Sequence, residues 1–270
     1  MNRFLESYIK STYGLDINNC SEEQLSTITE IILSDVTDIS QSEIQYDWDF
    51  SDFPNLKNLD CSYNHIESIN VRNNILLEKI RWEGVRGNFS APLDLSHNCN
   101  LKKVIGGQDG LIELDFSHNL ELEEIDIHLS SSLRWINVNN CNNLKRICLL
   151  GVNIPFVDLT SCPKLEYCDI HYLNLYRNQR DEYGDGYPRP IIFVNSNFNE
   201  NIIPVKTRQQ SYYSYYLVRT KNDSAESRFL SHLKSNKNFF TSILPDNRGR
   251  EVARLHYKLL DELENFRKKE

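Results

Sequence analysis

Two Asp-x-His motifs and one cysteine are the residues whose types and spacing could support chemistry. The motifs are Asp126-x-His128 and Asp169-x-His171, and Cys148 lies midway between them in the sequence. A metal ion could bind carboxylate, imidazole and thiolate groups together. Alternatively, a Cys148 thiolate could act as a nucleophile with a histidine as its base. Either chemistry requires the fold to bring these three segments together.

A repeating apolar pattern predicts the elements that carry these motifs. Two interleaved series of short apolar steps each recur every 21 to 24 residues. The first series is Leu59-x-Cys61, Ile80-x-Trp82, Val104, Ile125-x-Ile127, Ile147-x-Leu149 and Cys168-x-Ile170. The second series is Ile69-x-Val71, Leu93-x-Leu95, Leu114-x-Phe116, Ile136-x-Val138 and Val157-x-Leu159. A fixed period in this range indicates a solenoid, in which each turn buries its apolar side against the next turn.

The solenoid would place the two Asp-x-His motifs on strands two positions apart. At the usual strand spacing they lie roughly 10 Å from each other, with Cys148 on the strand between them. A metal at the midpoint is therefore within reach of long side chains. Against both chemical interpretations, histidines and aspartates are common on recognition surfaces, and an open sheet excludes water poorly. We therefore expect neither catalytic residues nor metal ligands here, and no cofactor.

The repeats resemble a known family. Residues from Leu56 to Ile69 fit the pattern L-x-x-L-x-L-x-x-N-x-L-x-x-L, with Cys61 at the third apolar position. The segments LKNLDCSYNHIESINVRNN and LIELDFSHNLELEEIDI resemble bacterial leucine-rich repeats of about 21 residues. The lead-in EEQLSTITEIILSDVTDIS is similar to the cap-to-repeat transition of internalin-like proteins. The resemblance covers roughly residues 21–176 and implies an α/β solenoid shaped as a curved horseshoe. The resemblance indicates almost nothing about function, because members of the family bind unrelated partners.

A column of short polar residues follows the second series. Inward-pointing amides there can bond backbone groups of adjacent turns that would otherwise be buried without partners. The column consists of Asn74, Asn98, Asn119, Cys141 and Cys162. We expect its two cysteines to be structural rather than reactive.

The pattern divides the chain into three parts. Residues 1–27 are expected to form a helical cap, with a helix over residues 2–14 and a capping box from Ser21 to Gln24. Residues 28–176 are expected to form the solenoid, with an acidic, aromatic-bearing insertion at 40–53. A turn-rich break follows Tyr176, and residues 177–270 are expected to form a strand-plus-helix cap or small module. Strands are predicted at 191–194 and 212–218, and two helices close the chain.

Composition narrows the classes of partner and location. The net charge is −8; residues 1–176 hold 13 Lys and Arg against 26 Asp and Glu, whereas residues 177–270 hold 17 against 12. An acidic repeat region would repel phosphates, so nucleic acid is an unlikely partner. No apolar stretch is long enough to span a membrane, and the N-terminus does not read as a secretory signal. Seven cysteines, an odd number, fit a reducing compartment. We expect a cytoplasmic protein, or one delivered into a host cytosol if it is an effector.

The two series differ in their outward residues. Those of the second series are nearly uniform, which indicates a structural ladder, whereas those of the first series are individual, as at a partner-binding surface. We therefore assign the first series to the concave sheet, although the Asn and Cys column usually follows the concave strand. The predicted partner-binding residues are Lys79, Arg81, Glu124, Asp126, His128, Arg146, Cys148, Tyr167, Asp169 and His171.

The sequence thus predicts a non-enzymatic module that recognises another protein on its concave sheet. Phosphate-binding loops, dinucleotide-binding fingerprints and common hydrolase motifs are missing from the sequence, and no small-molecule substrate is evident. The alternative is a bacterial effector whose activity lies in residues 177–270, with the repeats used for targeting.

Overall fold

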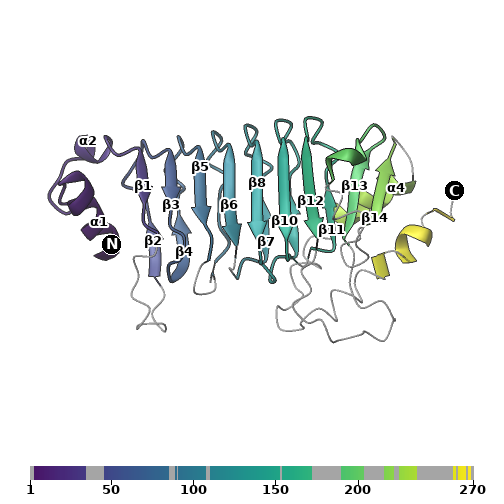
Figure 1. Cartoon of the computed structure of the whole chain (residues 1–270), viewed down its shortest axis with the longest axis horizontal. Coiled ribbons are helices and arrows are strands. Elements are labelled where there is room, and N and C mark those ends of the chain that lie inside the picture. The colour runs from purple at the N-terminus through teal and green to yellow at the C-terminus, as the bar shows by residue number, and fades with distance from the viewer. Residues whose placement is uncertain are drawn as a thin grey trace.

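The computed structural model is a solenoid of parallel β-strands (Figure 1). The strands run across the long axis of the molecule and follow one another side by side along it. Helices α1 and α2 lie at one end, and β13, β14 and α4 lie at the other. The described residues are 3–34, 46–84, 89, 91–107, 110–152, 154–171, 190–203, 216–221, 225–235, 258–259, 261–265 and 267–268.

Two helices lie at the N-terminal end of the solenoid. Helix α1 (Arg3–Tyr13) and helix α2 (Glu22–Leu25) precede the first strand, β1 (Glu30–Ile32). The backbone N–H of Ile32 donates to the hydroxyl of Tyr8, 3.0 Å away, so α1 supplies a partner to an otherwise open strand edge. The predicted capping box is confirmed, since Ser21 and Gln24 satisfy each other's backbone groups.

The first apolar series forms one continuous sheet of seven parallel strands. Its order is β1, β3 (Asn58–Asp60), β5 (Lys79–Trp82), β6 (Lys103–Gly107), β8 (Glu124–His128), β10 (Arg146–Leu150) and β12 (Tyr167–His171). The repeat positions are in register, as in the row from Val104 through Ile125 and Ile147 to Cys168. These four side chains are fully buried, so the predicted apolar spine exists.

The second series forms shorter sheets on the other side of the spine. They are β2 (Tyr46–Asp49) with β4 (Ile66–Asn70), β7 (Glu113–Asp115) with β9 (Trp135–Asn137), and β11 (Phe156–Asp158) with β13 (Ile191–Asn195) and β14 (Tyr216–Thr220). Leu93 and Leu95 are buried as the pattern predicts, but their segment is not a strand.

One part of the sequence interpretation is wrong. The expected insertion at 40–53 contains β2, which pairs in parallel with β4 and places Trp48 beside Ile69. Trp48, Phe50 and Phe53 are fully buried in the main core. Aromatic side chains here fill the place that aliphatic residues take in later turns, so the segment is itself a turn of the solenoid. Residues 40–45 lie outside the described part of the chain.

The predicted Asn and Cys ladder is confirmed. The Nδ2 of each ladder asparagine donates to two carbonyls of earlier turns: for Asn98 these are Val71 and Asn74, both at 2.9 Å. Asn119 continues the ladder to Leu95 and Asn98 at 3.0 and 2.9 Å. The thiol of Cys141 takes the next position, with Sγ 3.4 Å from the carbonyl of Phe116. Burial raises the pKa of the Cys141 thiol to about 12, as expected of a structural cysteine.

Parallel pairing continues beyond residue 176. β13 pairs with β11 and β14 pairs with β13, so both later strands extend the second series. Helix α4 (Ala225–Ser235) and helical residues 258–259 and 261–265 follow. Within the described ranges, no helix is long and apolar enough to cross a bilayer. Except for Pro190, the turn-rich break at 177–190 lies outside the described residues.

Candidate recognition surface

The outward-pointing side chains of the seven-stranded sheet form a surface that we call the outer sheet face. Strand alternation sends Leu59, Ile80 and Ile125 into the core and sends their neighbours outward. Nine of the ten predicted partner-binding residues have described side chains, and all nine are outward residues of strands β5 to β12. For the tenth, His171, only the backbone is described. The structure thus places these nine side chains on one face.

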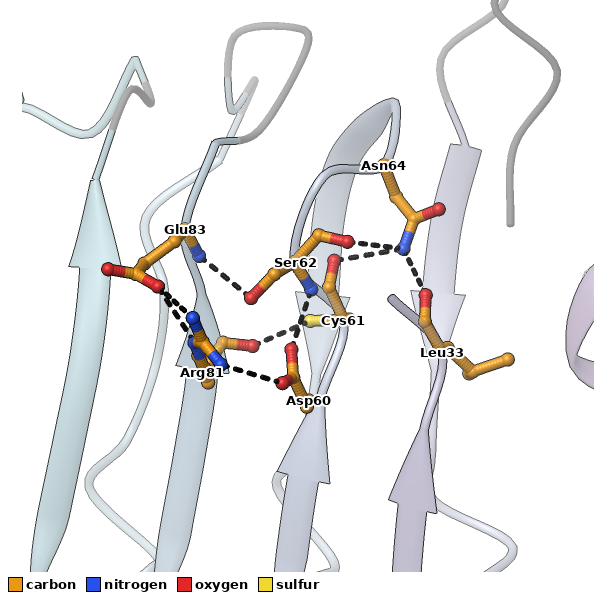
Figure 2. Close-up of polar contacts among 7 residues, drawn as sticks. All are labelled: Leu33, Asp60, Cys61, Ser62, Asn64, Arg81 and Glu83. Carbon is orange, nitrogen blue, oxygen red and sulfur yellow. Dashed lines mark hydrogen bonds and ion pairs between the residues drawn. The ribbon is translucent and has the colours of Figure 1, made fainter. Parts of the chain in front are cut away.

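Arg81 is held between two carboxylates from adjacent positions on this face. Its Nε lies 2.8 Å from Oε2 of Glu83, and its Nη1 lies 3.4 Å from Oδ2 of Asp60 on the neighbouring strand (Figure 2). The hydrogen bond with Glu83 is the main cause that raises the pKa of Arg81 above its usual value. Buried Ser62 supports this arrangement, since its hydroxyl accepts from the N–H of Glu83 at 3.1 Å.

A second chain of contacts crosses four strands. Lys103 on β6 lies 2.6 Å from Oε2 of Glu124 on β8, and Nε of Arg146 on β10 lies 3.5 Å from Oε1 of the same carboxylate. The guanidinium of Arg146 stacks over the ring of Tyr167 on β12, 3.9 Å from its centroid. The Tyr167 hydroxyl then donates to Oδ2 of Asp169 at 3.3 Å. These long side chains are therefore held in defined positions.

A third group joins Asp126, His128 and Cys148. The Sγ of Cys148 lies 3.7 Å from Nε2 of His128, and that nitrogen contacts the carboxylate of Asp126. Burial raises the pKa of the Cys148 thiol to about 12, and the negative charges of Asp126 and Asp169 add to the shift. A nucleophilic cysteine needs a lowered pKa, so the surroundings of Cys148 do not favour a thiolate nucleophile.

Sequence analysis missed three members of these networks. Asp60, Glu83 and Lys103 lie in the same outward columns as the predicted residues and bond Arg81 or Glu124 directly. For Asp60 and Lys103 the signal was present in the sequence, because each has an opposite charge in the same column on the next turn. Lys79 lies exposed at the start of β5, in register with Lys103.

Parallel strands at a 21- to 24-residue period, joined by a buried Asn and Cys ladder, make the chain a solenoid with leucine-rich-repeat-like turns. No protein-family model and no curated protein sequence matches it. Among solved structures it is similar to the functional domain of InlJ from Listeria monocytogenes, whose title describes a cysteine ladder. The two are 20% identical with a TM-score of 0.46, over 70% of this chain and 44% of that chain. This chain therefore spans less than half the length of that structure.

Proposed function

We propose that this chain is a non-enzymatic recognition protein that binds another protein on its outer sheet face. The stacked pair of Arg146 and Tyr167 carries the proposal. Arg and Tyr are enriched among the residues that dominate binding energy, and here they come from adjacent strands in a fixed arrangement. Glu124 contacts Arg146 and Asp169 contacts Tyr167, so two carboxylates lie beside the stacked pair. The face therefore offers hydrogen-bond acceptors and negative charge as well as a guanidinium to a partner of mixed polarity.

The position of the C-terminal helices supports the choice of face. Outward residues Trp135, Phe156 and Phe193 of the second series form one apolar cluster with Phe229 of α4 and with Leu263. Part of the second-series side is therefore covered by the chain itself. Most outward residues on β5, β8 and β10 are instead half-buried, polar and heterogeneous, which suits contact with a partner.

We further propose that residues 177–270 act as a C-terminal cap of the solenoid. The rings of Trp135 and Phe156 lie 5.4 Å apart, those of Phe156 and Phe193 6.1 Å, and those of Phe193 and Phe229 6.3 Å. This row of aromatic rings runs from the repeats into α4 without interruption. The described C-terminal residues thus pack on the repeats themselves, which favours a cap over an independent effector module.

Charge reversal tests the recognition proposal. Arg146→Glu and Arg81→Glu should each reduce capture of the partner from the native cell at least tenfold, with the melting temperature little changed. Lys145→Glu is the matched control, because Lys145 is exposed, adjacent in sequence and paired with Glu123 just before strands β10 and β8 begin. Capture at the wild-type level by Arg146→Glu and Arg81→Glu would contradict the assignment of this face. Loss of capture with the control as well would indicate a general charge effect.

A further inference from the structure

Asp126, His128 and Cys148, which we call the donor cluster, hold one oxygen, one nitrogen and one sulfur close together on the outer sheet face. One ligand atom of each residue lies within 4.8 Å of those of the other two. The pairing of β8 with β10 places Cys148 beside Asp126, and His128 follows two residues later on the same side of β8. The cluster is therefore built by strand register and not by a loop.

The donor cluster contains a buried carboxylate oxygen. Oδ1 of Asp126 is buried and lies in contact with Nε2 of His128. Asp169, the register partner of Cys148 on β12, brings a second carboxylate against the thiol. Two carboxylates beside a thiol and an imidazole form an electronegative site that a bound cation would stabilise.

We propose that the donor cluster is a zinc site with three protein ligands and one coordination position open to solvent. Carboxylate, imidazole and thiolate together are the donor set of zinc, whereas calcium and magnesium take oxygen ligands. Bond lengths of 2.0 to 2.3 Å in a tetrahedral site separate donor atoms by roughly 3.5 Å. The 3.7 Å between Sγ of Cys148 and Nε2 of His128 is close to that separation, whereas Oδ1 of Asp126 lies closer to Nε2 and would move away from it to admit the ion.

The neighbouring residues leave the site accessible from one side. Gly107, the register partner of His128 on β6, has no side chain, and Cβ at that position would lie 1.9 Å from the carbonyl oxygen of His128. Strand β6 therefore approaches the His128 backbone closely. The side chain of His128 is 38% exposed, so the fourth ligand can be water or a group supplied from outside. This proposal does not depend on partner binding, because zinc can be measured on the isolated chain.

Metal titration of the full-length, chelator-treated protein tests the proposal. Calorimetry with Zn²⁺ should show one site per chain, and Co²⁺ should give an intense thiolate-to-metal absorption band with tetrahedral d–d bands. Cys148→Ser should abolish the thiolate band, and His128→Gln and Asp126→Asn should each weaken zinc affinity at least tenfold. Cys99→Ser and His118→Gln are matched controls, because both side chains are exposed on turns away from the cluster.

The outcomes separate a built site from adventitious binding. The proposal is supported if the control variants retain wild-type affinity and the thiolate band while the cluster variants lose them. It is overturned if wild type binds no zinc, or if Cys148→Ser and His128→Gln bind as tightly as wild type, which would indicate an adventitious ion only. Far-ultraviolet circular dichroism confirms that each variant is folded. Should Cys148→Ser fail that check, the half-exposed His128→Gln decides the result alone.

Discussion

The Nζ of Lys234 in α4 lies 3.1 Å from Oδ1 of Asn139, a residue 95 positions earlier that follows strand β9. The same ammonium group forms an ion pair with the buried carboxylate of Asp158 on β11. One side chain from the C-terminal part thus bonds two successive turns of the solenoid. Removing that part would leave Asp158 buried without this cation and would expose the aromatic cluster below it.

Truncation of Phe229 measures whether α4 and the repeats unfold together. Phe229 is fully buried, so Phe229→Ala should lower the free energy of unfolding by about 3–5 kcal/mol. Urea unfolding should remain a single transition, and hydrogen exchange should accelerate in β9 and β11. Ser231→Ala, on the exposed side of the same helix, should cost less than about 0.5 kcal/mol. Faster exchange confined to α4 would indicate an independent module instead of a cap.

The buried amides of the Asn ladder should contribute more to the free energy of unfolding than exposed amides that make the same kind of hydrogen bond. Asn119→Ala removes two buried hydrogen bonds, to the carbonyls of Leu95 and Asn98, and should cost about 2–3 kcal/mol. Each carbonyl also accepts a backbone N–H, which keeps the loss from being larger. Asn119→Cys should cost less than the alanine change, because Cys141 already occupies the next position.

Asn100→Ala is the control for the ladder prediction. The exposed amide of Asn100 bonds the carbonyl of Ile75 at 2.9 Å, and water can replace it there. We expect a cost below about 1 kcal/mol in the same denaturation assay. If Asn100→Ala and Asn119→Ala were equally destabilising, burial of the ladder would not be the source of its contribution.

Gly106 and Trp82 should be energetically coupled. A Cβ on Gly106 would lie 2.3 Å from Cε2 of the fully buried Trp82 ring, so Gly106→Ala should destabilise by about 1–3 kcal/mol. Trp82→Phe shortens the ring system that a Cβ would meet. In a double-mutant cycle, the pair should therefore cost less than the sum of the single changes. Additive effects would show that the strand moves away from the ring without resistance.

Alkylation of metal-free protein tests the electrostatics around Cys148. A pKa of about 12 leaves little thiolate at neutral pH, and the reaction rate should rise about tenfold per pH unit from pH 7 to 9 without a plateau. Exposed Cys99 should react at least about 100-fold faster at pH 7.5. Peptide mapping after timed iodoacetamide pulses measures both rates. A fast, saturating reaction at Cys148 would revive the nucleophile hypothesis.

The pairing of opposite charges along the outward columns could be predicted only in part from the sequence. The residue types at 60, 81 and 83 are visible in the sequence, but their contacts depend on strand register and on rotamers held by neighbours such as Ser62 (Figure 2). The segment from Tyr46 to Phe53 was misassigned because its buried residues are aromatic and its charges resemble those of a loop. Burial of Trp48 against the turn that follows outweighed that local pattern.

The sequence by itself determined the solenoid, its buried positions and its Asn and Cys ladder. A repeat of 21 to 24 residues forces equivalent side chains into the same environment, so local periodicity contains that information. Only the tertiary structure decided that Asp126, His128 and Cys148 meet, and that the C-terminal helices pack on Trp135 and Phe156. These outcomes depend on contacts between segments far apart in the chain. The repeat pattern does not specify which side of the solenoid a distant helix will cover.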